Sequence, residues 1–444
     1  MRSARVIDAA NVLRDLSGGS LDSAPTICRV AFRQPDGRIG KRDFATHWIH
    51  RYPAKMFHRI PRIILQAVAG SRPMNVLDPF CGSGTVLLES ILSGHDAIGI
   101  DVNPMAQLIS RVKTTPIEPA HLSRHLRYIK DRALRITEGQ DRDEVLDFWF
   151  KPDVRYTLHA LLRSINSIDH VPCREFFTVC LSACVRPCSW ADPTISPPVK
   201  LCRTRARVAG DRYRKHYKRA NSLTVAHVLQ EFDRTSTENL RRMSQLFGSA
   251  PLATARIIDG NCEASSTGLL GESVDLVLTS PPYCGAQKYV RSLRLEMLML
   301  GMSRQVIAEA DRRTLGTERV SSTSTAQWTD FRSATVTQLI RRINARNQVR
   351  AFMLAEYISY LDQFAKELRR VLKHDGDAFV TFGTDHIAGF KVDSAAIFAD
   401  LAASHSLQHV ATLIDHIPSR GMITIRHSTA GTISDERVVW LRRG

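Results

Sequence analysis

The sequence lacks any run of about eighteen apolar residues, which is the length a membrane-spanning helix needs. Residues 1–19 lack the apolar stretch of a secretory signal, and they carry acidic residues that a transit peptide would not. Nine cysteines are spread over 444 residues without paired spacings, which is typical of reduced thiols. These absences exclude membrane-spanning proteins and disulfide-rich secreted proteins, and we expect a cytoplasmic protein.

Standard metal-binding spacings are missing as well. Cys180, Cys184 and Cys188 recur every four residues and would share one face of a helix. A metal site would need a fourth ligand, for which Cys173 or Cys202 is available. The spacing matches neither paired C-x-x-C zinc motifs nor the three-cysteine radical pattern. The pattern therefore favours small buried side chains, and we expect no metal.

The sequence also lacks the two common nucleotide-binding loops, the dinucleotide loop and the P-loop. Residues 76–85, VLDPFCGSGT, nevertheless have the pattern of a strand, a tight turn and a helix start. They lack the G-x-G-x-x-G spacing of a dinucleotide site and the Gly-Lys-Ser/Thr of a P-loop. The glycines permit a close approach of the backbone to a ligand, and the following helix directs its N-terminus at a carboxylate or similar group. A second strand, 97–101, ends in Asp101, which is well placed for ribose hydroxyls.

A different motif follows the apolar run 274–278. Thr279 and Ser280 precede two prolines and Tyr283. The prolines fix the backbone and remove donors, so nearby carbonyls stay available as acceptors, while Tyr283 offers a flat ring for stacking. This arrangement suits an exocyclic amino group on a nucleobase. The alternative is a simple proline turn after a strand.

Basic residues are in excess, with 61 Lys and Arg against 44 Asp and Glu, for a formal net charge of +17. This charge suits a polyanion, although it does not separate nucleic acid from an anionic membrane surface. A first basic cluster comprises Arg203, Arg205, Arg207, Arg212, Arg214, Lys215, Lys218 and Arg219. Tyr213 and Tyr217 are interleaved there and could stack on unpaired bases. A second basic cluster comprises Arg341, Arg342, Arg346 and Arg350. Both clusters predict DNA contacts, with a solvated helix face as the alternative.

Three motifs in this order, DPFCGSGT (78–85), GIDVNP (99–104) and TSPPY (279–283), resemble the S-adenosylmethionine-dependent amino-methyltransferases of DNA. The SPPY form is commoner among members that methylate cytosine N4. Residues 50–57 resemble the cofactor-side motif of that family, and residues 283–301 resemble the helix after its catalytic loop. The resemblance covers residues 44–115 and 250–444.

The resemblance implies a site for S-adenosylmethionine. The loop 78–84 would hold its methionine end, with Phe80 against it, and residues 52–55 would cover its carboxylate. Asp101 would take the ribose hydroxyls and Asp259 would lie near the adenine, although Asp259 could simply end a strand and Lys55 could be a surface lysine. The expected cofactor-binding residues are Tyr52, Pro53, Ala54, Lys55, Asp78, Pro79, Phe80, Cys81, Gly82, Gly84, Thr85, Asp101, Asn103, Asp259 and Thr279.

The expected catalytic residues are Ser280, Pro281, Pro282 and Tyr283. The amino lone pair of cytosine is delocalised into the ring, and hydrogen bonds to the Ser280 hydroxyl and the Pro281 carbonyl would localise it toward the methyl donor. Positioning and electrostatics then dominate, without a metal or a covalent intermediate. Because the amine lies inside a duplex, the base must be flipped into the pocket, where Tyr283 would stack on it.

The expected fold is a doubly wound Rossmann-like α/β sheet, mostly parallel with a C-terminal antiparallel strand, plus a helical insertion. Residues 1–43 are expected to be irregular, residues 44–116 and 250–444 to form the catalytic domain, and residues 117–249 to form the insertion, a candidate for target recognition. Strands are predicted at 75–78, 97–101, 256–259, 274–279, 378–382, 408–416 and 436–442, and a long loop at 302–335.

The function predicted from these motifs is a prokaryotic DNA cytosine-N4 methyltransferase that acts on double-stranded DNA, with a possible partner restriction nuclease. Adenine-N6 methylation of DNA and methylation of RNA are alternatives, although those enzymes usually carry Asp or Asn before Pro-Pro-Tyr. A DNA-binding protein that has lost catalysis is a third. The recognition sequence and the oligomeric state stay open.

Overall fold

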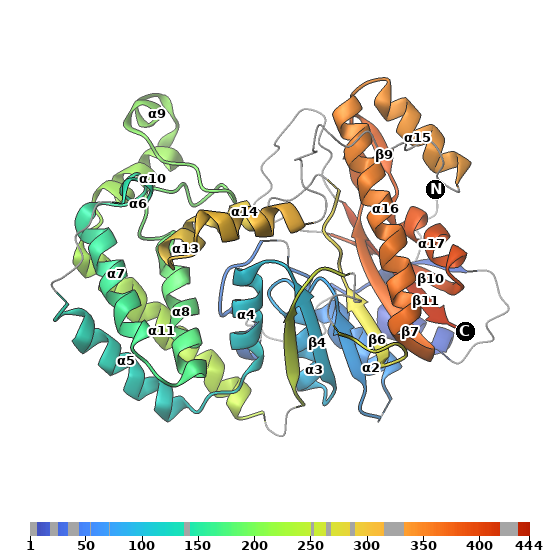
Figure 1. Ribbon diagram of the computed structural model, residues 1–444, viewed down its shortest axis with the longest axis horizontal. Coiled ribbons are helices and arrows are strands. Elements are labelled where there is room, and N and C mark those ends of the chain that lie inside the picture. The colour runs from blue at the N-terminus through green and yellow to red at the C-terminus, as the bar shows by residue number, and fades with distance from the viewer. Residues whose placement is uncertain are drawn as a thin grey trace.

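The computed structural model describes residues 7–17, 25–33, 44–53, 55–70, 72–136, 143–249, 253–262, 268–284, 289–314, 333–417 and 434–444. Figure 1 shows a sheet flanked by helices on one side of the molecule and a lobe of helices on the other. Within the described residues, no helix combines the length and apolar character that crossing a membrane requires.

The main sheet has nine strands in the order β1-β2-β10-β11-β7-β6-β3-β4-β5. Pairing is parallel from β5 to β7, and β11 runs antiparallel to both of its neighbours, β7 and β10. The strands are β1 (Ile7–Asp8), β2 (Thr26–Ala31), β3 (Asn75–Asp78), β4 (Asp96–Asp101), β5 (Ala255–Asp259), β6 (Val274–Thr279), β7 (Leu372–Gly383), β10 (Leu407–His416) and β11 (Asp435–Arg443). The doubly wound, mostly parallel sheet with a C-terminal antiparallel strand is therefore confirmed.

The alternation of apolar side chains along the central strands explains the layered architecture, because successive strand residues face opposite sides of a sheet. Val76 and Leu276 join one core cluster, whereas Leu77 and Val277 join another. The first cluster lies under α1 (Ala9–Ser17) and α2 (Arg59–Val68). The second lies under α15 (Ala334–Asn344), α16 (Gln348–Val371) and α17 (Ser394–Ser404).

The strand order reverses direction between β3 and β6, which are neighbours although about two hundred residues separate them in sequence. From β3 the chain moves outward through β4 to β5, and then returns to β6 and β7 on the other side. A crevice for ligands is expected outside the carboxyl ends of strands at such a switch point. Both predicted motifs, at 78–85 and 279–283, follow these two strands directly.

The segment between β4 and β5 is helical, as predicted. It begins with α4 (Pro104–Thr114), whereas α3 (Thr85–Leu92) lies earlier, between β3 and β4. After α4 the segment forms a helical lobe made of α5 (Pro119–Ala133), α6 (Glu144–Asp147), α7 (Pro152–Asn166), α8 (Val171–Val185), α9 (Arg203–Val208), α10 (Asp211–Asn221) and α11 (Val225–Phe247). Cys180, Cys184 and Cys188 are free and buried in the core of this lobe. No metal-binding group of His, Cys, Asp or Glu occurs among the residues that the structure describes.

The prediction of an irregular segment at 1–43 is wrong for residues 7–17, which form β1 and α1, and for residues 26–31, which form β2. β2 pairs in parallel with β10, and Arg33 forms ion pairs with Asp415 and Glu436. Little local signal marks β2, because its stability comes from pairing with β10, almost four hundred residues away in sequence. Residues 1–6, 18–24 and 34–43 lie outside the described residues.

The predicted loop at 302–335 also contains helix. Residues 304–313 form α14 (Arg304–Arg313). Ser303 caps the N-terminus of this helix, because its side chain accepts a hydrogen bond from the Val306 N–H. This segment follows α12 (Tyr289–Ser292) and α13 (Arg294–Met299). A small hairpin of β8 (Asp385–Ile387) and β9 (Phe390–Val392), which the sequence pattern did not indicate, follows β7.

A substitution at Gly99 on β4 can test how tightly the centre of the sheet packs against α3. A Cβ added at this position would lie 2.6 Å from Leu87 Cδ1 and 2.9 Å from Cys81 Sγ. Gly99→Ala should therefore lower the free energy of unfolding by about 1–3 kcal/mol, measured by urea denaturation. Gly210→Ala, where the added carbon meets nothing within 4 Å, is the matched control and should change it by less than about 1 kcal/mol. Equal stability of the two variants would contradict this packing.

Candidate functional site

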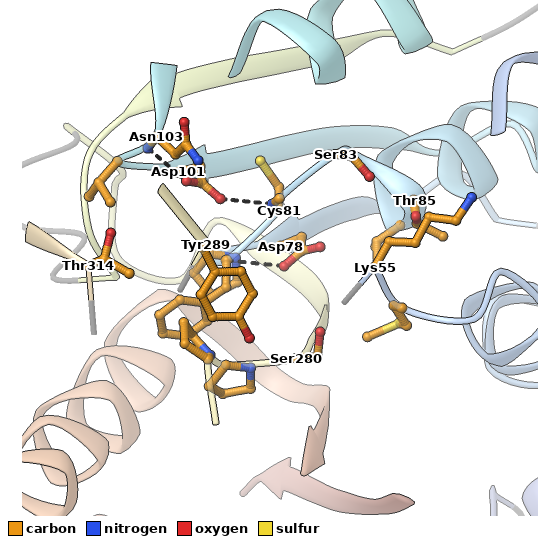
Figure 2. Close-up of a pocket in the computed structure, with 18 of the residues that line it drawn as sticks. Lys55, Asp78, Cys81, Ser83, Thr85, Asp101, Asn103, Ser280, Tyr289 and Thr314 are labelled. Atoms are coloured by element: carbon orange, nitrogen blue, oxygen red, sulfur yellow. Dashed lines mark hydrogen bonds between the residues drawn. The ribbon is translucent and has the colours of Figure 1, made fainter. Parts of the chain in front are cut away.

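A cavity of about 1110 Å³, partly open to solvent, lies at the switch point of the sheet. Its lining brings together segments that are far apart in sequence (Figure 2). These include residues before α2, the turn after β3, the tip of β4 and the residues after β6. The lining residues expected from the sequence are Tyr52, Lys55, Asp78, Pro79, Phe80, Cys81, Gly82, Thr85, Asp101, Asn103, Ser280, Pro281, Pro282 and Tyr283.

The turn after β3 requires glycine at two positions. Gly82 and Gly84 have φ angles of +49° and +72°, in the left-handed region that favours glycine. A Cβ at Gly84 would also lie 2.8 Å from Ser110 Oγ. That hydroxyl donates a hydrogen bond to the Gly82 carbonyl at 2.8 Å. The turn is thus held from behind, and its backbone is left facing the cavity.

Asp101 at the tip of β4 holds this turn in place. Its carboxylate accepts hydrogen bonds from the backbone N–H groups of Gly82 and Asn103, both at 2.8 Å. Burial raises the pKa of Asp101 to about 6, against the lowering effect of these bonds. Asn103 in turn caps α4 by accepting a bond from the Met105 N–H at 3.0 Å. Asp101 therefore links the first two motifs and remains at the cavity wall.

Asp78 links the first motif to the third. Its carboxylate accepts a hydrogen bond from Thr279 Oγ1 at 2.6 Å and another from the Phe80 N–H at 3.2 Å. Burial is the largest effect on this carboxyl and raises its pKa to about 7. Thr279 is fully buried and does not line the cavity. The structure thus places Thr279 behind Asp78 as a support for that side chain.

Ser280 is half-buried and lines the cavity on the side opposite Asp101 and Asn103 (Figure 2). Pro281, Pro282 and Tyr283 continue the same wall. Tyr289 lies beside them, and its hydroxyl is hydrogen-bonded to the Tyr283 backbone. A ligand in this cavity would therefore contact the glycine turn on one side and the Ser-Pro-Pro-Tyr segment on the other.

Other predicted residues are not at the cavity surface. Pro53 and Gly84 do not line the cavity, although residues next to them in sequence do. Ala54 lies outside the described residues. Asp259 accepts a hydrogen bond from Gln107 Nε2 at 3.0 Å and pairs with Arg313 at 3.4 Å. The residues that follow it, Gly260 and Asn261, line the cavity instead.

Several lining residues were missed by sequence reasoning. Ser83 lies within the glycine motif and could have been found there. Met56, Val86 and Val102 also line the cavity, as do Arg313 and Thr314 from the predicted loop. The remaining missed residues are Tyr360 on α16, Thr381 on β7 and Glu436 on β11. These last residues carry no local signal because only the sheet order brings their elements to the switch point.

Both basic clusters are at the surface. All eight residues of the first are exposed on α9 and α10, and in the second Arg341, Arg342 and Arg346 are exposed at and just after α15. Arg342 and Arg346 stack on Phe390 of the β8–β9 hairpin at 4.9 and 4.5 Å. Tyr213 and Tyr217 are half-buried and pack on Arg205 and Trp190. These contacts do not favour the predicted stacking of the two tyrosines on unpaired bases.

Known proteins similar to this chain include type II methyltransferases. No protein-family model matches the chain. A type II methyltransferase, M.MvaI of Kocuria varians, is 26% identical over 398 residues, covering 85% of each chain. M.BsoBI of Geobacillus stearothermophilus, also a type II methyltransferase, is 22% identical over 61% of this chain and 56% of its own. An rRNA methyltransferase from Streptomyces viridochromogenes aligns with 93% of this chain and 96% of its own, at 12% identity and a TM-score of 0.31. A likeness at that TM-score supports no conclusion.

The pKa of Asp78 generates a prediction about stability. The folded protein keeps a proton on this carboxyl up to about pH 7, whereas the unfolded chain releases it near its ordinary pKa of about 3.9. Because the folded state binds more protons in this window, stability falls as pH rises from about 4 to 7. Asp78→Asn keeps an acceptor for Thr279 without the charge, and should be more stable than the wild type at pH 8 by on the order of 1–4 kcal/mol.

Urea denaturation at pH 4 and pH 8 measures this difference, which should vanish at the lower pH. Asp131→Asn, an exposed position on α5, should change stability by less than about 0.5 kcal/mol at either pH. A destabilised Asp78→Asn variant at pH 8 would show that the Asp78 charge stabilises the unliganded fold.

Proposed function

We propose that this protein is an S-adenosylmethionine-dependent DNA methyltransferase that modifies the N4 amine of a cytosine flipped out of duplex DNA. The observation that carries the proposal is the single cavity shared by the glycine turn, Asp101 and the Ser-Pro-Pro-Tyr segment. The 2.6 Å hydrogen bond from Thr279 to Asp78 fixes the two halves of this cavity relative to each other. Similarity to type II methyltransferases over most of the chain supports the same class of reaction.

The residues at the glycine turn fit the proposed cofactor. The turn brings backbone close to a ligand because Gly82 and Gly84 adopt positive φ angles. Asp101 at the end of β4 is where a ribose is expected in a doubly wound sheet, and the half-buried Phe80 offers an apolar contact. When bound, S-adenosylmethionine supplies an electrophilic methyl group. The chain would hold the cofactor with this turn, Asp101 and Asn103.

The acceptor half of the site would work through hydrogen bonding. Ser280 Oγ and the Pro281 carbonyl accept hydrogen bonds from the target amine and localise its lone pair toward the methyl group. The two prolines keep that segment rigid, and Tyr283 stacks on the base. Because the amine is otherwise buried in a duplex, the target nucleotide must leave the base stack to reach this wall.

The basic clusters support a duplex as the partner. In Figure 1, α9 and α10 lie at the top of the helical lobe and α15 at the top of the sheet, with α14 between them. The two basic clusters therefore lie on opposite sides of the segment that follows the Ser-Pro-Pro-Tyr motif. The formal net charge of +17 favours a polyanion in this position. We also propose that the protein acts in the cytoplasm and has a restriction nuclease as its partner, because its relatives are type II methyltransferases.

Methylation of plasmid DNA tests this function. We expect the purified protein with S-adenosylmethionine to produce 4-methylcytosine at a defined sequence, detected at base resolution. Ser280→Ala should lower turnover by about 10²-fold or more, because one preorganised acceptor is lost, while the dissociation constant for S-adenosylmethionine stays within about 2-fold. Methylation at adenine N6, or of RNA in place of DNA, would redirect the substrate assignment. Cofactor binding without methyl transfer would favour a protein that has lost catalysis.

The first basic cluster gives a second prediction. Arg203 and Arg207 are exposed on α9, and Arg212 is exposed on α10. If each contacts a phosphate, changing all three to Ala should reduce the slope of log affinity against log salt concentration by about 2–3, because each contact contributes about 0.9. Fluorescence anisotropy with a labelled duplex at several salt concentrations measures that slope.

The control removes the same charge elsewhere. Arg124, Arg127 and Arg132 are exposed on α5, which Figure 1 places at the lower end of the helical lobe, away from α9. The corresponding triple Ala variant should leave the slope nearly unchanged. If both variants lower the slope equally, the effect is one of total charge and the first basic cluster is a solvated surface.

A further inference from the structure

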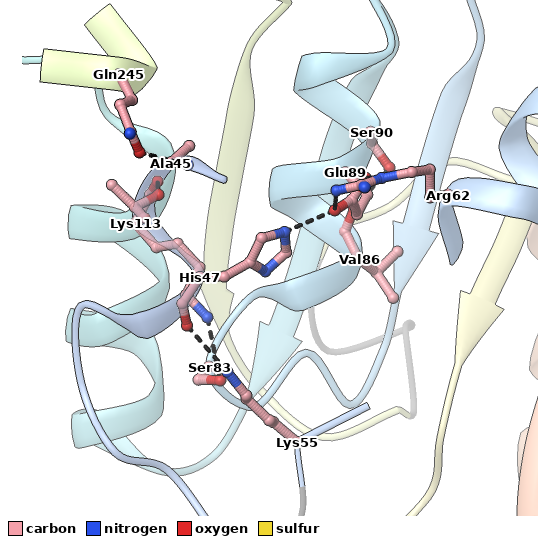
Figure 3. Close-up of polar contacts among 11 residues, drawn as sticks. Ala45, His47, Lys55, Arg62, Ser83, Val86, Glu89, Ser90, Lys113 and Gln245 are labelled. Carbon is pink, nitrogen blue, oxygen red and sulfur yellow. Dashed lines mark hydrogen bonds and ion pairs between the residues drawn. The ribbon is translucent and has the colours of Figure 1, made fainter. Parts of the chain in front are cut away.

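Lys113, near the end of α4, is a buried lysine that the predicted site does not use. It is 1% exposed, and its Nζ lies 3.3 Å from Ser83 Oγ (Figure 3). Within the described residues Lys113 has no ion pair with a carboxylate. Burial, together with the nearby charge of Lys55, lowers the pKa of Lys113 well below its usual range. An isolated buried ammonium is unfavourable unless a counter-charge accompanies it.

A buried carboxylate in the same region, that of Glu89, already has other partners. Glu89 on α3 contacts His47 Nε2 at 2.6 Å and accepts two hydrogen bonds from Arg62, at 2.8 and 2.9 Å (Figure 3). These contacts lower the pKa of Glu89 despite its burial. The charge of Glu89 is thus balanced without Lys113. Glu89 therefore provides no counter-charge for Lys113, and a counter-charge would come from outside this network.

Two buried hydroxyl groups are at the cavity wall, and one of them, that of Ser83, is the hydrogen-bond partner of Lys113. Ser83 and Thr85 line the cavity and are only 2% and 4% exposed. Thr85 Oγ1 has no hydrogen-bond partner among the described residues, although it is buried. Thr85 also begins α3, whose N-terminus favours negative charge. One end of the cavity therefore has three features that favour an anion. These are the unpartnered hydroxyl of Thr85, the N-terminus of α3 and the buried Lys113 behind Ser83.

Lys55 completes this end of the cavity. It lines the cavity, and its Nζ donates a hydrogen bond to the His47 carbonyl at 3.1 Å. Figure 2 shows Lys55, Ser83 and Thr85 grouped at one end, with Asp101 and Asn103 at the other. The two ends of the cavity therefore differ in charge: the Lys55 end is basic and the Asp101 end is acidic. A ligand with a carboxylate at one end and hydroxyl groups at the other would bind in one orientation.

We infer that Ser83, Thr85 and Lys113 form the binding site for the carboxylate of S-adenosylmethionine, with Lys113 as a buried positioning residue that acts through Ser83. This inference rests on the proposed function and assigns Lys113 a role in orienting the cofactor. Ser83 donates its hydroxyl hydrogen to the carboxylate and accepts a hydrogen bond from Lys113. Thr85 donates its free hydroxyl. The buried charge of Lys113 gains its counter-ion when the cofactor binds.

The test compares two ligands that differ in this carboxylate. We expect Lys113→Met to weaken binding of S-adenosylmethionine by about 10-fold or more, because a charge-assisted hydrogen-bonded interaction is lost. Binding of decarboxylated S-adenosylmethionine should stay within about 2-fold of the wild type. Isothermal titration calorimetry measures both dissociation constants. Arg111→Met is the matched control, since it removes the same charge from α4 at a residue paired with Glu175, and it should affect neither ligand.

Two further measurements separate this role from a structural one. Replacing a buried cation by an apolar side chain of similar size is often neutral or stabilising, so unliganded Lys113→Met should melt no lower than the wild type. Ser83→Ala should reproduce the selective loss without changing Lys113. Equal weakening of both ligands in these variants, or no weakening of either, would overturn the inference. If the wild-type protein binds neither compound, the proposed function itself fails.

Discussion

The hydrogen bond from Thr279 to Asp78 is the contact on which the candidate site depends. These residues end two parallel strands, β6 and β3, that are neighbours in the sheet and far apart in sequence. One motif supplies the donor and the other supplies the acceptor, so neither half of the cavity is positioned without the other. Asp101 extends the same arrangement to β4 by binding the backbone of Gly82. Three strand ends are thus tied together by two carboxylates.

The helical lobe is joined to this site through Arg186, just after α8. Its guanidinium donates to the carbonyls of Ile195, Ser196 and Ser292, and it pairs with Glu296 on α13 at 3.2 Å. The last two residues belong to the segment that follows the Ser-Pro-Pro-Tyr motif. Arg186 therefore connects the end of α8 to the segment that follows the acceptor wall of the cavity.

The sequence predicted most of the fold because its strand-forming runs and motifs coincide. Apolar strands end directly in Asp78, Asp101 and Thr279, so the motif positions also marked the carboxyl edge of the sheet. Lys113 was not predicted, since a lysine in the last turn of a helix is ordinary and its burial depends on packing against Ser83 from another element. Glu436 was missed for a similar reason: the antiparallel pairing of β11 with β7 brings it to the cavity. Local patterns identify which residues end strands, and long-range pairing decides which of them meet.

The site concentrates buried charge that the unliganded fold does not balance. Burial raises the pKa of both Asp78 and Asp101 and lowers that of Lys113, so each of these groups is held away from its preferred charge state. Elsewhere in the same region the chain balances buried charge fully, as Glu89 shows with His47 and Arg62. Burial also raises the pKa of Asp385 and of Glu296, neither of which lines the cavity. What distinguishes Asp78, Asp101 and Lys113 is their place at or beside a cavity, where a bound ligand would supply the missing partners and where perturbed pKa values are typical of functional sites.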